Sequence, residues 1–202
     1  MRETAGFGAE ISFPENGVPY SPVPLLGSGL DPEKVHRYDP FERERTLDRI
    51  HAVELFKQKV GEEIPIIGWV EGVLAETADL RGVDTLMMDL AEGADGLVDV
   101  MDMVFEQQCR FAKAQIDAGA HIIGVGNAVA SLIGPGLYEE FALDYDRRMV
   151  EYIHSHGALV KLHICGNIKA LLPLLQQVAP DILDVDWMVD FKLAVDTFRG
   201  KP

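Results

Sequence analysis

Cysteine, positive charge and long apolar runs are all scarce in this 202-residue sequence. Its two cysteines, Cys109 and Cys165, are too few for a disulfide framework. A net charge of −15 at pH 7 disfavours a nucleic-acid partner, because phosphates would be repelled. No apolar run approaches the roughly 20 residues that span a membrane, and the first residues lack the basic-then-apolar pattern of a signal peptide. We therefore expect a cytoplasmic protein with no membrane or nucleic-acid partner.

Two common nucleotide-binding motifs are also missing. The segment "GWVEGVL", which follows the first predicted strand, contains Gly68 and Gly72 but no G-x-G-x-x-G fingerprint. No G-x-x-x-x-G-K-[ST] phosphate loop occurs anywhere in the chain. The 48% hydrophobic and 25% charged residues are typical of a globular protein.

The chain divides at about residue 38 into two kinds of sequence. Residues 1–38 are expected to be irregular, because five prolines between positions 14 and 32 prevent regular structure. Residues 39–202 alternate between helical and strand patterns and are expected to form a single domain. The patterns predict helices over 39–61, 96–118, 131–157, 167–179 and from 190 onward, and strands over 64–70, 120–127, 158–165 and 181–187.

Alternating strands and helices, with strands that are almost wholly apolar, predict an α/β fold with a parallel sheet. A doubly wound sheet and a (β/α)8 barrel both fit this pattern. The missing dinucleotide fingerprint favours the barrel. In either architecture the functional residues lie where the strands end.

Polar residues lie at the C-terminal end of each of the four predicted strands. They are Glu71, Asn127, the pair His163 and Cys165, and the pair Asp184 and Asp186. Glu71, Asn127 and Asp186 are therefore candidate catalytic residues. Asn127 could equally satisfy backbone groups in a loop, and Asp186 could equally cap the following turn.

The third strand ends in "HICGN", which places His163 and Cys165 two residues apart. Side chains at i and i+2 of a strand point to the same face, so the imidazole and the thiol would project together. This arrangement suits two zinc ligands. A buried cysteine also acts commonly as a small hydrophobe, and the residues alone leave both interpretations open. A catalytic zinc takes three protein ligands, and the remaining candidates are Glu71, Asp186 or a residue outside this chain.

The stretch from Gly119 to Ile168 resembles the uroporphyrinogen decarboxylase superfamily, and more closely its zinc-dependent corrinoid methyltransferase branch. The similarity lies in "SLIGP", "LYEEF" and, most specifically, "HICGN". "GWVEGVLAETADLRG" and "DILDVDW" resemble further segments of that family, so the likeness spans nearly the whole chain.

The resemblance implies a β/α barrel of the decarboxylase type, with His163 and Cys165 as two zinc ligands and a later cysteine as the third. No cysteine follows Cys165 in this sequence. We therefore expect a fragment with four of eight barrel strands, whose open edges could favour a homo-oligomer. The family's activity would be methyl transfer between a thiol or methoxylated small molecule and a corrinoid carried by a partner protein.

Two alternative functions remain. One is uroporphyrinogen decarboxylase itself, which needs no metal and grips its substrate with an arginine-rich N-terminal segment that "MRETAG" matches poorly. The other is a non-catalytic barrel fragment or binding subunit. The histidine–cysteine pair, which has no role in the decarboxylase, favours the methyltransferase.

Overall fold

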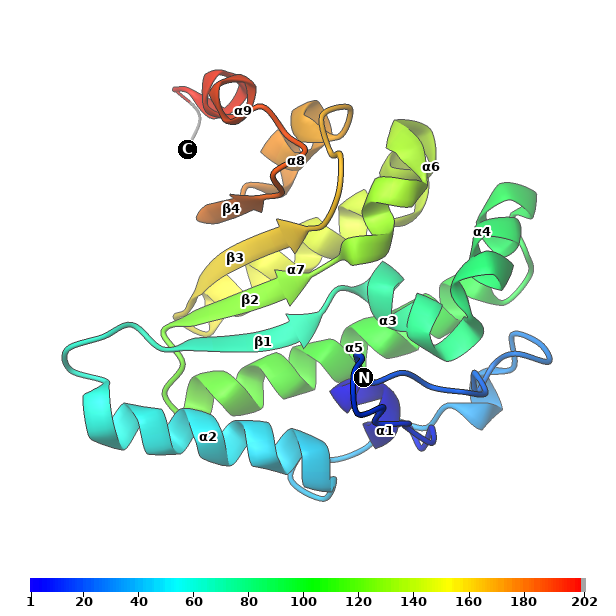
Figure 1. Cartoon of the computed structure of the whole chain (residues 1–202), viewed down its shortest axis with the longest axis horizontal. Helices are drawn as coiled ribbons and strands as arrows, with labels where there is room; N and C mark the ends of the chain where they lie inside the picture. The colour runs from blue at the N-terminus through cyan, green and yellow to red at the C-terminus, as the bar shows by residue number, and fades with distance from the viewer. Residues whose placement is uncertain (201–202) are drawn as a thin grey trace.

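The computed structural model describes residues 1–200, and its four strands form one parallel sheet in the order β1-β2-β3-β4 (Figure 1). The strands are β1 (Ile67–Glu71), β2 (Ile122–Gly126), β3 (Leu159–Ile164) and β4 (Ile182–Val185). All four predicted strands are confirmed, with ends that differ from the prediction by one to three residues; β1 starts three residues later and ends one residue later than expected.

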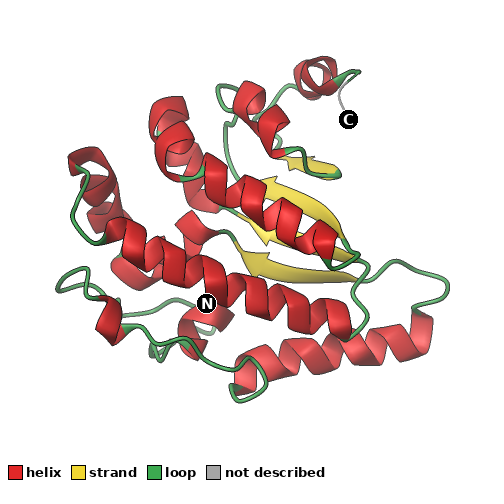
Figure 2. Ribbon diagram, turned by 180° about the vertical axis from the view of Figure 1, so that it is seen from behind, coloured by secondary structure: helices red, strands yellow, loops and turns green. Residues whose placement is uncertain are grey.

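Helices α5 (Leu97–Asp117) and α7 (Leu143–Ser155) connect successive strands and lie against the same face of the sheet (Figure 2). A doubly wound sheet would reverse its strand order and carry helices on both faces. The unreversed order and the one-sided cover are those of a β/α barrel wall. The structure therefore confirms the barrel-type α/β fold, of which residues 1–200 form a part.

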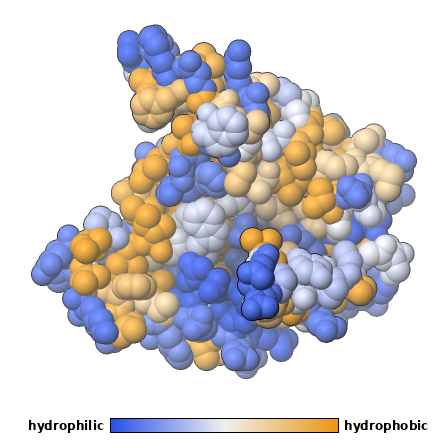
Figure 3. Space-filling model, in the orientation of Figure 1, coloured by the Kyte–Doolittle hydropathy of each residue, from blue (hydrophilic) through white to orange (hydrophobic). Residues whose placement is uncertain are grey.

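The two faces of the sheet differ in chemistry. Val70, Ile123 and Leu162 are at most 2% exposed and pack toward the helices. The opposite face carries Trp69 and Lys161 with glycines between them, and Figure 3 shows it as a hollow lined by hydrophilic and intermediate side chains. This alternation follows from the two-residue period of a strand. The open face is where a ligand can reach the sheet.

Trp69 occupies space on the open face that β2 leaves free. A Cβ built on Gly124 would lie 2.3 Å from the indole ring, and one built on Gly126 would lie 2.7 Å from it. We expect Gly124→Ala to cost about 1–3 kcal/mol of folding free energy, because the ring or the strand must move. Gly136→Ala in α6 (Gly134–Phe141) is the control, since a Cβ there meets nothing within 4 Å and alanine favours a helix. Urea denaturation of both variants checks this, and equal effects would contradict it.

Five further helices surround this framework. They are α1 (Arg2–Gly6), α2 (Glu44–Val60), α3 (Val73–Arg81), α4 (Val83–Glu92) and α9 (Phe191–Phe198). None of the described helices is long and apolar enough to cross a membrane. Helix α1 lies inside the segment predicted to be irregular and contacts α2 and α3, while the division at residue 38 stays a prediction. Helices α3 and α4 were not predicted from the sequence; α3 is buried almost all round, so it lacks an amphipathic period.

Three helix predictions were wrong in their extent. The expected helix over 131–157 is two helices, α6 and α7, which are interrupted at Ala142. The expected helix over 167–179 shrinks to α8 (Leu172–Val178), with Pro173 in its first turn, where a missing N–H is tolerated. Helix α2 begins five residues after Asp39, because residues 39–42 form a turn.

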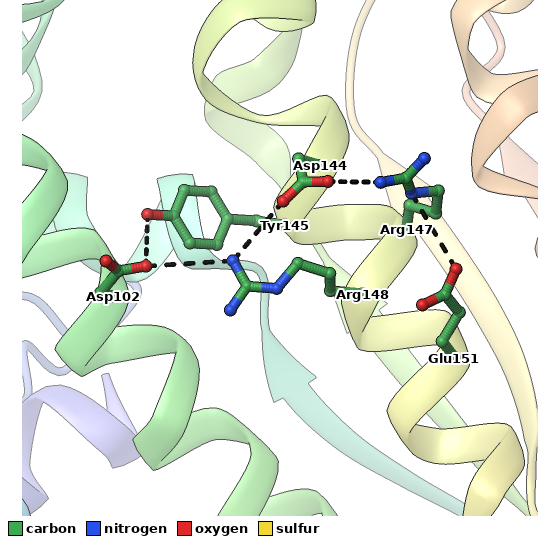
Figure 4. Close-up of polar contacts among 6 residues, drawn as sticks. All are labelled: Asp102, Asp144, Tyr145, Arg147, Arg148 and Glu151. Atoms are coloured by element: carbon green, nitrogen blue, oxygen red, sulfur yellow. Dashed lines mark hydrogen bonds and ion pairs between the residues drawn. The ribbon is translucent and has the colours of Figure 1, made fainter.

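Polar contacts on the outer surface link α5 to α7 (Figure 4). The hydroxyl of Tyr145 donates to Asp102 at 2.9 Å, and the guanidinium of Arg148 lies 3.5 Å from Asp144 and 3.9 Å from Asp102. Arg148 also lies over the ring of Phe105, 4.2 Å from its centroid. These side chains are partly exposed, so each ion pair contributes little to stability.

Candidate functional site

The polar strand ends meet in one row across the sheet. The parallel register pairs Glu71 with Gly126, Gly126 with His163 and His163 with Asp184. Residues at one register level point to the same face, which here is the open one. Glu71, His163 and Asp184 therefore share one register level of the sheet, with Gly126 as the small residue between Glu71 and His163.

His163 and Cys165 lie together at the end of β3. The imidazole Nε2 is 3.0 Å from the Cys165 Sγ, and the thiol is exposed. The imidazole Nδ1 lies 3.1 Å from the main-chain oxygen of Asp184, to which it can donate a proton. A proton on Nδ1 leaves the Nε2 lone pair facing the thiol. Two atoms that can ligate a metal ion thus lie side by side at the C-terminal end of β3, as the two-residue spacing predicts.

The end of β4 contacts His163 and Gly166, the residue that follows Cys165. The Asp184 carboxylate is 3.6 Å from the His163 Nδ1 and 2.7 Å from the Lys161 ammonium. The Asp186 carboxylate accepts hydrogen bonds from the backbone N–H of Gly166 at 2.9 Å and of Met188 at 3.1 Å. The bond from Gly166, followed by that from Met188, holds the pKa of Asp186 below its usual range.

Glu71 lies at the end of β1 beside Trp69. Its carboxylate accepts from the indole Nε1 at 3.2 Å, and its backbone N–H donates to Glu3 at 3.1 Å. Burial, followed by the negative charge of Glu3, raises the pKa of Glu71 to about 7. This carboxyl can therefore hold or release a proton near neutral pH.

Asn127 is fully buried and belongs to a hydrogen-bonded cluster behind the loop that follows β2. Its Nδ2 donates to both oxygens of Asp146 at 3.1 Å, and the Tyr138 hydroxyl donates to the same carboxylate at 2.6 Å. Burial raises the pKa of Asp146 to about 6, although the hydrogen bonds from Tyr138 and Asn127 oppose the rise. The Asn127 Nδ2 is therefore engaged by Asp146, whereas the buried Asn127 Oδ1 has no hydrogen-bond partner among residues 1–200.

A tight turn after Cys165 completes the site. Gly166 has φ +88°, a left-handed conformation that side chains other than glycine rarely adopt. A Cβ there would also lie 3.0 Å from the Ser131 hydroxyl, in the loop that Asn127 anchors. Both the conformation and the space require glycine at this position.

His163 and Cys165 supply two of the ligand atoms that a zinc ion needs. A tetrahedral ion with bonds of about 2.0–2.1 Å to nitrogen and 2.3 Å to sulfur holds the two atoms about 3.5 Å apart, so a small side-chain rotation would admit it. A metal-binding histidine commonly donates its other N–H to a carbonyl or carboxylate, as His163 does here. Among residues 1–200, however, no three His, Cys, Asp or Glu side chains are grouped to hold a metal ion. His163 and Cys165 are thus two suitable ligands that need at least one more.

Asp146, Tyr138 and Trp69 were not predicted as site residues. The sequence does contain a pattern that points to Asp146, because it lies four residues after Ala142 and eight after Tyr138, on one stripe of the predicted helix. A carboxylate on such a stripe indicates a buried acid with a hydrogen-bond donor. No comparable signal marked Trp69, because its position depends on glycines of a neighbouring strand.

Several known proteins are similar to this chain in sequence. The uroporphyrinogen decarboxylase (URO-D) family model matches residues 1–201. The methylcobamide:CoM methyltransferase MtbA of Methanosarcina mazei is 30% identical over 81% of this chain and 48% of its own length. The uroporphyrinogen decarboxylase of Carboxydothermus hydrogenoformans is 22% identical over 96% of this chain and 56% of its own.

A solved structure shares the fold. A methyltransferase from Methanosarcina mazei superposes with a TM-score of 0.87 at 24% identity, covering 97% of this chain and 58% of its own. The chain thus spans about half the length of the curated relatives that it matches. The family match extends over nearly every residue, and the chain belongs to the uroporphyrinogen decarboxylase (URO-D) family.

Proposed function

We propose that the protein acts in zinc-dependent methyl transfer between a small substrate, a thiol or a methoxylated compound, and a corrinoid carried by a partner protein. The observation that carries this proposal is the pairing of His163 Nε2 and Cys165 Sγ at 3.0 Å on the open edge of the sheet. The similarity to methylcobamide:CoM methyltransferases supports the choice of methyl transfer over other zinc chemistry. We place the reaction in the cytoplasm, where free thiols such as Cys165 persist.

His163 and Cys165 would hold the metal from one side, and the open face of the sheet leaves the other side accessible to a substrate. Bound zinc would lower the pKa of a thiol substrate, or polarise a methyl ether oxygen, and so promote transfer of the methyl group. The thiolate of Cys165 binds a cation better than the thiol does, so metal binding releases its proton to solvent.

The other candidate residues take different parts in this proposal. Glu71, with a pKa of about 7 and a place in the same row as His163, is the candidate for moving a proton at neutral pH. The Nδ2 of Asn127 is engaged by Asp146, and the carboxylate of Asp186 is engaged by backbone N–H groups. We propose that these two residues position the site rather than react.

Equilibrium dialysis of the metal-free chain against Zn²⁺ tests the proposal. We expect one zinc per chain, together with zinc-dependent loss of the methyl group from added methylcobalamin in the presence of a thiol. A chelator should stop the loss, and added Zn²⁺ should restore it. A well-folded chain that takes up no zinc would contradict the proposal. Decarboxylation of a tetrapyrrole by the same metal-free chain would favour the decarboxylase alternative.

A further inference from the structure

Asp184 and Asp186, at the end of β4, make polar contacts near His163 and Cys165 in addition to the backbone pairing of β3 with β4. In a parallel pair of strands, the backbone alone sets the register. Here the side chain of Asp186 also reaches across to the Gly166 N–H, and Asp184 meets the imidazole of His163 with its main-chain oxygen. Both acceptors are on β4 or directly after it, and both groups that they hold are on β3 or directly after it.

Asp186 acts on the cysteine side of the pair. One of its two oxygens accepts from the N–H of Gly166, which follows β3, and the other accepts from the N–H of Met188, which follows β4. Gly166 is the residue next to Cys165 and has a left-handed φ, and because glycine has many accessible conformations, the hydrogen bond to Asp186 is what restrains this turn. The direction of the Cys165 side chain is therefore set by a turn that the Asp186 carboxylate holds closed.

Asp184 acts on the histidine side. Its carbonyl accepts from Nδ1 at 3.1 Å, and its carboxylate lies 3.6 Å from the same nitrogen. Lys161 binds that carboxylate at 2.7 Å and keeps it beside the ring. A negative charge near Nδ1 favours a proton on that nitrogen and so leaves Nε2 free as a donor atom.

We propose that Asp184 and Asp186 are positioning residues that fix the donor atoms of His163 and Cys165 for a metal ion. The inference rests on the proposed function for the identity of the bound species, but not for the contacts themselves. The two aspartates of the D-x-D sequence at the end of β4 then have separate roles, since Asp184 selects the imidazole tautomer and Asp186 holds the turn beside the thiol.

Zn²⁺ competition titrations of the full chain test the inference. We expect Asp186→Ala to weaken zinc binding about 10- to 100-fold, the range typical when a partner of a metal ligand is removed. Asp186→Asn should weaken zinc binding less than Asp186→Ala, because its amide oxygen can still accept from Gly166 although its NH2 group cannot accept from Met188. Asp184→Asn should weaken binding about tenfold. The control is Asp196→Asn, a surface aspartate paired with Lys192, which should change nothing.

A second readout needs no metal. Exchange of the Gly166 amide hydrogen should accelerate in Asp186→Ala and stay slow in Asp186→Asn, and ¹⁵N spectra should show a smaller Nδ1–H population for His163 in Asp184→Asn. If the wild type takes up no zinc, the proposed function fails, while these two signals still decide the inference. Wild-type zinc affinity in Asp186→Ala and Asp184→Asn, or unchanged exchange and tautomer signals, would overturn it.

Discussion

Cys165→Ala and His163→Ala are each expected to reduce the affinity of the chain for Zn²⁺ by more than about 100-fold, or roughly 2.7 kcal/mol. The thiolate and the imidazole are the two donor atoms that the structure brings within 3.0 Å of each other, so neither loss can be compensated by the other. Cys165→Ala should change folding stability little, because the Cys165 side chain is exposed. His163→Ala should also lower stability, because the His163 side chain is only 25% exposed and its Nδ1 lies within hydrogen-bond distance of the Asp184 carbonyl. Competition with a chromophoric chelator measures the affinities.

Matched controls exist for both substitutions. Cys109 is the other cysteine and is buried on α5, away from the strand ends, so Cys109→Ala should keep full zinc affinity even if it lowers stability. His51 is exposed on α2, and His51→Ala should change neither property. Loss of zinc in Cys109→Ala, or its retention in Cys165→Ala, would assign the metal to another site.

Asp146→Ala should have the largest effect on stability of the substitutions near the site. The Asp146 carboxylate is the acceptor for the Tyr138 hydroxyl and the Asn127 amide, and both donors are fully buried. Removing it leaves two donors without a partner, at about 1–3 kcal/mol each. We expect a loss of about 2–4 kcal/mol at pH 5, measured by urea denaturation. Asp144→Ala, an exposed position two residues away, should cost less than about 0.5 kcal/mol.

The cost of Asp146→Ala should also depend on pH. The pKa of Asp146 rises from an ordinary 3.8 to about 6 in the folded protein, so the folded state binds more protons than the unfolded state between these values. Wild-type stability therefore falls as pH rises from about 4 to about 6. Between pH 5 and pH 7.5 the cost of the substitution should shrink by roughly 1.4 kcal/mol. A cost that grows with pH, or that equals the cost of Asp144→Ala, would contradict the buried cluster.

The sequence predicted the strands and their polar ends well, because both depend on local patterns. A run such as "ALVKLHIC" is apolar at alternate positions, and its period places Lys161, His163 and Cys165 on one face whatever the neighbouring strands do. The parallel direction of the strands also follows from repeated strand–helix units. These are properties that short stretches of sequence can determine.

Side-chain contacts between segments that are far apart in the chain could not be predicted from the sequence. The role of Asp186 depends on a hydrogen bond to Gly166, 20 residues earlier. The pKa of Glu71 depends on burial by the folded chain and, after it, on the charge of Glu3, 68 residues earlier. Helix α3 was missed because nearly every one of its residues is buried, which removes the contrast between faces that identifies a helix. In each case the deciding interaction joins segments that no local pattern connects.

X-ray absorption at the zinc K-edge of the zinc-loaded chain tests the central claim most directly. If His163 and Cys165 hold the ion, the first shell contains one sulfur at about 2.3 Å and nitrogen at about 2.0–2.1 Å, and the sulfur disappears in Cys165→Ser. A first shell of oxygen and nitrogen alone in the wild type, with no sulfur, would contradict the account.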